Sequence, residues 1–186
     1  MYNIIGSFVS PDILPQIKIM GEIEMKVQSK TQMLATNALI GAIYILATTM
    51  LAPISYGAVQ FRMAEVLMLL PFYNKNYSYG IAIGCLVANM FSPLGIIDVV
   101  VGTGSSILVL WLYTKVKSIW SAVAITTLSC SIFVGSTLYF VLGVPPLFAY
   151  VYVGFGELVV LLIGVALFKT LMKNKTVRRL IIDGKK

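Results

Sequence analysis

The sequence contains no histidine and few charged residues. Charged residues make up 11% of the 186 residues, and the mean hydropathy is +0.92. A soluble domain carries about 25% charged residues, so this composition indicates an integral membrane protein. The lack of histidine removes the commonest metal ligand and general base. Cys85 and Cys130 lie far apart in apolar runs without CxxC spacing, which favours buried free thiols over a zinc or redox site.

Motifs for nucleic-acid binding and for ATP hydrolysis are also missing. The net charge is +7, but the basic residues lie beside hydrophobic runs and at the C-terminal tail, with no basic face interleaved with exposed aromatics. The small residues at 102–106, GTGSS, are not a phosphate loop, because the lysine and the preceding strand are absent. A transport role would therefore need an energy source on another subunit.

Six apolar stretches are predicted to cross the membrane. They are residues 33–51, 58–72, 77–91, 96–116, 119–142 and 148–172. About 20 helical residues cross a hydrocarbon core of about 30 Å. Apart from Arg62, every Lys and Arg falls before the first stretch, in the turns after the second and fourth, or at or beyond the end of the sixth. By the positive-inside rule we expect an all-α membrane protein with six transmembrane helices and cytoplasmic N and C termini.

Residues 1–24 differ from the rest of the chain. They contain Pro11 and Pro15 and no long apolar run, and they lack the basic start of a signal peptide. Gly21-Glu22 is compatible with codons for a ribosome-binding site just upstream of a start at Met25. We therefore expect an N-terminal extension, residues 1–24, that lies upstream of the true start, and a membrane domain, residues 25–186.

A polar segment interrupts the apolar sequence at residues 52–71, APISYGAVQFRMAEVLMLLP. It carries Gln60, Arg62 and Glu65, and charges inside a membrane are stable only when they face a partner or a wet cavity. Arg62 and Glu65 are three apart and share one side of a helix. They form either an internal ion pair or one wall of a solute site in which Arg62 orients Glu65.

Glu65, Asp98 and Glu157 are the only acidic residues within the predicted spans. Asp98 and Glu157 lie about 26 Å and about 24 Å along their helices from the lysines at the cytoplasmic end, and Glu65 lies deeper. Asp98 also fits a simpler role at the positive end of the helix dipole. Three isolated acids facing lipid would be unfavourable, so we expect them to converge on one wet pocket near the outer side. With Arg62 the formal charge there is about −2, which suits a cationic solute with several N–H donors.

Aromatic and small residues allow two interpretations each. Five aromatics near the outer surface either stack on a flat ring or belong to an interfacial belt: Tyr56, Phe61, Tyr150, Tyr152 and Phe155. Trp111, Tyr113 and Trp120 stand in belt positions around the turn at Lys115 and Lys117. Gly80 and Gly84, and likewise Ala38 and Ala42, are four apart and allow another helix to approach closely.

Two blocks of this sequence resemble the QueT family. They are APISYGAVQFRMAE at residues 52–65 and ANMFSPLGIID at residues 88–98, with the small residues of 102–106 beside them. The similarity covers nearly everything after Met25. Members of this family are proposed queuosine-precursor S-components, the substrate-binding subunits of energy-coupling factor (ECF) transporters. The resemblance implies six helices in a prokaryotic plasma membrane, no enzymatic activity, and a separate module of a T-component and two ATPases.

The resemblance also implies a substrate and residue roles. The substrate would be a 7-deazaguanine such as 7-aminomethyl-7-deazaguanine, whose ammonium group and donor-rich edge agree with the charge count above. Glu65 or Glu157 would take the guanine edge, Asp98 the ammonium, and Gln60 and Asn89 the other polar atoms of the ring. An alanine pattern on the first helix would contact the T-component, here formed by Ala35, Ala38 and Ala42.

Three alternatives stay open from the residues alone. The same architecture could bind another cationic vitamin or nucleobase. The chain could instead be a membrane scaffold whose acids pair internally. An intramembrane enzyme is disfavoured, because neither histidine nor a clear pair of nucleophile and base is present.

Overall fold

The computed structural model describes residues 14–56 and 61–183, and all regular structure within these ranges is helical. The chain divides into two compact units, Met1–Ala35 and Thr36–Lys186. Helix α2, Leu14–Met50, runs through both of them. The predicted extension, residues 1–24, lies partly outside the described ranges, and its separate status remains a prediction.

Four helices are long and apolar enough to cross a membrane. They are the Lys30–Met50 part of α2, then α6 (Ile96–Tyr113), α7 (Ile119–Leu142) and α8 (Pro146–Leu171). These correspond to the first, fourth, fifth and sixth predicted spans, which are confirmed as candidate membrane helices. Each exposes large apolar side chains, for example Phe140 on α7. In water such a surface would be unfavourable, whereas lipid tails cover it without penalty.

The second and third predicted spans form shorter helices. The 3₁₀ helix η1 (Met63–Leu69) continues into α4 (Leu70–Tyr73), and η2 (Lys75–Tyr77) leads into α5 (Ser78–Asn89). Eleven residues of η1 and α4 extend about 20 Å, and twelve of α5 about 18 Å, both less than the hydrocarbon core of about 30 Å. Pro71 lacks an N–H, so it cannot donate to the Leu67 carbonyl as an α-helix requires; Leu70 makes a 3₁₀ bond to Leu67 instead. A count of six spans is therefore not confirmed.

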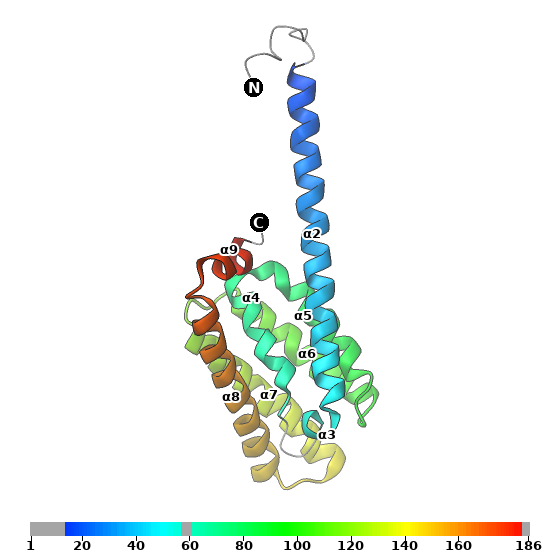
Figure 1. Cartoon of the computed structure of the whole chain (residues 1–186). Coiled ribbons are helices and arrows are strands. Elements are labelled where there is room, and N and C mark those ends of the chain that lie inside the picture. Colours follow the sequence, from blue (N-terminus) through cyan, green and yellow to red (C-terminus); the bar gives the residue numbers. More distant parts are fainter. Residues whose placement is uncertain (1–13, 57–60, 184–186) are drawn as a thin grey trace. The chain divides into compact units, whose positions relative to one another are not determined.

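Successive long helices of the second unit pack on one another, and the last of them packs back on the short helix η1 (Figure 1). α5 packs on α6, α6 on α7, α7 on α8, and α8 on η1. The short helix α3 (Ala52–Ser55) follows α2, and α9 (Lys175–Asp183) follows α8 and contacts α4. The charged segment around Arg62 and Glu65 is thereby enclosed by the packed helices.

Glycines allow α2 and α5 to cross at close range. A Cβ atom at Gly80 would lie 2.5 Å from the Asn37 carbonyl oxygen, and one at Gly84 would lie 3.0 Å from the Gly41 Cα. The Gly80 N–H also donates to the Asn37 Oδ1 atom at 2.7 Å. The predicted close-packing role of Gly80 and Gly84 is confirmed.

The aromatic residues at one end of α6, α7 and α8 form only part of the predicted belt. Trp111 and Trp120 are more than half exposed, and the ammonium groups of Lys115 and Lys169 lie 5.8 and 5.3 Å from their respective ring centres. Tyr113 differs from the prediction. It is buried, and its hydroxyl forms a 2.6 Å hydrogen bond with Thr126.

Candidate functional site

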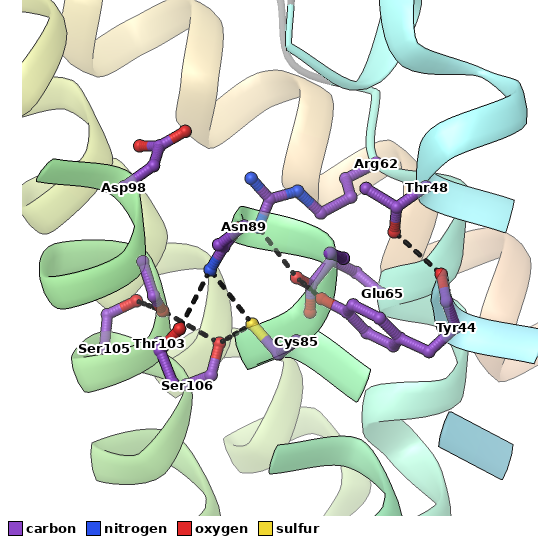
Figure 2. A network of polar contacts seen from close by, with 12 residues as sticks. Tyr44, Thr48, Arg62, Glu65, Cys85, Asn89, Asp98, Thr103, Ser105 and Ser106 are labelled. Atoms are coloured by element: carbon purple, nitrogen blue, oxygen red, sulfur yellow. Dashed lines mark hydrogen bonds and ion pairs between the residues drawn. The ribbon is translucent and has the colours of Figure 1, made fainter. Parts of the chain in front are cut away.

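Glu65 lies at the centre of a buried charged cluster between α2 and η1. Its side chain is 1% exposed, and its Oε1 atom accepts a 2.6 Å hydrogen bond from the Tyr44 hydroxyl. Arg62 Nη1 lies 3.7 Å from the same oxygen (Figure 2). Both predicted interpretations of this pair are therefore geometrically compatible, because one carboxylate oxygen is paired inside the protein while the other, Oε2, has no partner among the described residues.

The start of helix η1 determines this geometry. Arg62 has a non-helical backbone conformation (φ −82°, ψ 85°). It directly precedes η1, whose first turn contains Glu65. The Glu65 N–H donates to the Arg62 carbonyl at 2.8 Å, which closes a tight turn between the two charged residues. Tyr44 is presented from the buried side of α2, as are Asn37 and Thr48.

A second polar network joins α5 to α6. The Asn89 amide donates to Thr103 Oγ1 at 3.1 Å and to Cys85 Sγ at 3.4 Å. Cys85 Sγ in turn lies 3.2 Å from Ser106 Oγ, and both Ser105 and Ser106 donate to the Gly102 carbonyl. Figure 2 shows this network beside the Glu65 cluster. The carbonyl oxygen Oδ1 of Asn89 is buried and has no partner among the described residues.

Small residues on α6 make room for this network. A Cβ atom at Gly102 would lie 2.8 Å from Asn89 Nδ2, so a larger residue there would force the amide to shift.

Asp98 lies in the first turn of α6, as predicted. Its Oδ2 atom accepts a hydrogen bond from the Ser92 hydroxyl, and both side chains are buried. The turn between α5 and α6 positions Ser92, whose hydroxyl also accepts from the Leu94 N–H at 3.2 Å. The Asp98 charge acts on the Tyr56 phenol, and so does that of Arg62.

Tyr56 connects these groups. Its hydroxyl donates to the Ala88 carbonyl at 2.6 Å, and the Arg62 guanidinium lies 5.7 Å from its ring centre. Phe61 is half-buried next to Arg62 in the chain. Of the other predicted aromatics, Tyr152 and Phe155 are exposed, as expected for lipid-facing belt residues rather than a stacking surface.

Glu157 on α8 is the third buried acid. It is 3% exposed, and its Oε1 atom has no partner among the described residues. Helix α8 packs on η1, so Glu157 and Glu65 lie on neighbouring helices, whereas Asp98 lies on α6.

Several predicted residues cannot be placed in this cluster. Gln60 lies outside the described residues. Ala35, Ala38 and Ala42 are exposed on α2, whereas Tyr44 and Thr48 of the same helix are buried. The alanines thus do not pack inside the bundle.

Two cavities lined by described residues lie away from the acids. One, of about 320 Å³, lies between α6 and α7 near Ile97 and Phe140; the other, of about 450 Å³, lies at α9. A shared hollow among the three acids remains a prediction.

Among the described residues, no group of three or more His, Cys, Asp or Glu could hold a metal ion.

Tyr44, Ser55 and the Cys85–Ser106 contact were not anticipated from the sequence. A weak signal exists for Tyr44, because Asn37, Tyr44 and Thr48 recur at helical spacing within an apolar span. Ser55 is fully buried, and its hydroxyl has no partner among the described residues. Both residues extend the candidate site toward α2 and α3.

Comparison with known proteins identifies the family. Residues 34–173 match the QueT transporter family. The chain is 39% identical over 85 residues to a protein of Lactococcus lactis subsp. cremoris (strain MG1363) named "Queuosine precursor transporter QueT". This match covers 45% of the chain and 50% of that protein, so the chain spans about half the length of the curated relative. No solved structure matches.

The family match extends over most of the chain and agrees with the four apolar helices. It supports a multi-pass protein of the cell membrane. The chain belongs to the QueT transporter family.

Proposed function

We propose that this protein is the substrate-binding subunit of an ECF-type uptake transporter that imports a queuosine precursor such as 7-aminomethyl-7-deazaguanine. The relative's printed name supports the substrate class. Energy would come from a separate T-component and two ATPases, because this sequence carries no motif for ATP hydrolysis.

One observation carries the proposal: three buried carboxylate or amide oxygens have no partner among the described residues. They are Glu65 Oε2, Glu157 Oε1 and Asn89 Oδ1. Each buried unsatisfied group disfavours the folded state by about 1–3 kcal/mol, so such atoms are retained where a ligand uses them. A 7-deazaguanine with a protonated aminomethyl group offers several N–H donors and one positive charge, which complements these acceptors.

The hydrogen-bonding capacity of each side chain suggests its role. Glu157 and Glu65 would accept the N–H groups of the guanine edge, and Asn89 a further ring donor. Arg62, which keeps one buried N–H without a partner at Nε, would donate to a ring acceptor. Asp98 would take the ammonium group, with Tyr56 and Phe61 as aromatic neighbours of the ring, and Gln60 would bond another polar atom of the ring.

Calorimetric titration of the purified protein with 7-aminomethyl-7-deazaguanine tests this function. Glu157→Gln removes the negative charge while keeping the shape of the side chain, and we expect it to weaken binding at least tenfold. Asp183→Asn on α9 is the matched control, because it removes one carboxylate outside the candidate site.

Equal affinities for wild type and Glu157→Gln would contradict the proposed site. Tight binding of a different vitamin or nucleobase in a parallel panel would retain the subunit role and replace the substrate. A scaffold role would be indicated if the Glu157 and Glu65 variants changed only the melting temperature and no solute in the panel bound.

Two parts of the proposal concern the whole assembly. Apart from Arg62, the basic residues lie before the first predicted span, in alternate connections and toward the tail, which supports six crossings with both termini in the cytoplasm. In that topology the short helices from Met63 to Tyr73 and from Ser78 to Asn89 supply the second and third crossings. The exposed alanines of α2 supply a surface for the T-component, because small side chains let another helix approach closely.

A further inference from the structure

Helix α9 is a short helix held at one end of the bundle. Asn174 caps it, since its Oδ1 atom accepts from the Thr176 N–H at 2.9 Å. The Asn74 amide donates to the Ile182 carbonyl at 3.1 Å, which ties α9 to the turn after α4. The position of α9 is therefore defined by contacts at both of its ends.

The two sides of α9 differ in chemistry. Val177 and Ile181, four residues apart, are half-buried. Lys175, Arg178 and Arg179 are exposed and, with Ile182, line a cavity of about 450 Å³. These residues are spaced at i, i+3, i+4 and i+7, so the three charges are gathered on one face of the helix.

The chain around α9 is strongly basic. Among the residues whose side chains the structure describes, the one ion pair between a basic and an acidic side chain joins Arg62 to Glu65. Seven Lys and Arg residues follow Glu157 in the sequence, and Asp183 is the one acidic residue among them. A surface with such an excess attracts an anion.

The location of α9 at the membrane interface favours a lipid over a soluble anion as the ligand. α9 begins four residues after α8 ends at Leu171. Near that end of α8, Lys169 lies over the exposed Trp120, and Lys115 lies over the exposed Trp111. Tryptophan and lysine in this arrangement mark the headgroup level of a bilayer. The basic cavity therefore opens where phospholipid phosphates are concentrated.

We propose that the basic face of α9 formed by Lys175, Arg178, Arg179 and Ile182 binds the phosphate headgroup of an anionic phospholipid. The two guanidinium groups suit phosphate because each can donate two parallel N–H bonds to its oxygens. Ile182, 40% exposed, provides an apolar contact for the adjoining part of the lipid. This site is independent of the substrate site among Glu65, Asp98 and Glu157.

Native mass spectrometry of the full chain tests the proposal. The protein is reconstituted with equal amounts of phosphatidylglycerol and phosphatidylcholine and then released from detergent. We expect wild type to retain phosphatidylglycerol preferentially. The double variant R178Q/R179Q should retain at least fivefold less phosphatidylglycerol than wild type. The matched control K115Q/K117Q removes two charges at the neighbouring turn and should retain the lipid.

Three results would overturn the site. Equal retention by wild type and R178Q/R179Q would show that the arginines do not bind lipid. Equal loss in both double variants would indicate general attraction to the basic end of the molecule. Displacement of the lipid by excess inorganic phosphate would assign the cavity to a free anion. The altered side chains are exposed, and an unchanged melting temperature confirms that each variant is folded.

Discussion

Tyr44 brings a hydroxyl from an apolar helix to a buried carboxylate. It is fully buried, and its hydroxyl donates to Glu65 at 2.6 Å, the shortest contact that this carboxylate makes in the described structure. Arg62 at 3.7 Å is farther than a hydrogen bond. We therefore regard Tyr44 as the residue that positions Glu65.

Replacing Tyr44 by phenylalanine should destabilise the protein. The change removes one hydrogen bond to a charged group, which contributes about 1.5–3 kcal/mol. Melting of the purified protein in detergent measures the effect, and Tyr79→Phe is the control because Tyr79 is 72% exposed. Equal melting temperatures for both variants would show that Arg62 alone holds the carboxylate.

Part of the candidate site could be predicted from the sequence. Charged residues inside apolar runs are rare enough to stand out, so Glu65, Asp98, Glu157 and Arg62 could be selected without coordinates. Tyr44 could not, because tyrosine is common in membrane helices and its hydroxyl partner lies 21 residues away. The partner of Asp98 likewise depends on the turn conformation that brings Ser92 to it.

At the scale of helices, the crossing of α2 and α5 is the tightest contact described. Gly80→Ala should destabilise the protein by about 1–3 kcal/mol, because its Cβ atom would overlap the Asn37 backbone. Gly104→Ala on α6 is the matched control, since a Cβ atom there meets nothing within 4 Å. Alanine in a helix interior is about 0.5–1 kcal/mol better than glycine, so the control should melt at the same or a higher temperature. A stable Gly80→Ala protein would contradict the close crossing.

The exposed side of α2 gives a second prediction for an element. Ala42→Trp should prevent copurification with an ATPase and T-component module, because a large ring blocks close helix approach. Substrate binding should be unchanged, since Ala42 is exposed and Tyr44 lies on the buried side of the helix. Ile43→Trp is the control on the neighbouring exposed surface. Loss of the module in both variants, or in neither, would exclude the alanine surface as the specific contact.

Hydropathy predicted the long helices better than the short ones. The predicted span 119–142 coincides with α7, and the left-handed Gly143 (φ 67°) ends that helix as glycine at this position commonly does. The predicted spans 58–72 and 77–91 form shorter helices, because Met63–Leu69 is a 3₁₀ helix rather than an α-helix and α5 covers Ser78–Asn89. Apolarity alone does not report such interruptions.

For the whole molecule, the distribution of charge predicts which end faces the cytoplasm. Lys117 and Leu142 lie at opposite ends of α7 and are exposed. In intact cells, a membrane-impermeant thiol reagent should label Leu142→Cys, whereas Lys117→Cys should react only after permeabilisation. The reverse pattern would place the basic end outside and refute the proposed topology.

The contact between Cys85 and its neighbours has a practical consequence. Its sulfur is fully enclosed between Asn89 and Ser106, at the interface of α5 and α6. An alkylating reagent can reach it only in molecules whose two helices have separated. The rate at which Cys85 is alkylated in the wild-type protein would thus report how often α5 and α6 separate. A solute that bridges the two helices would lower this rate.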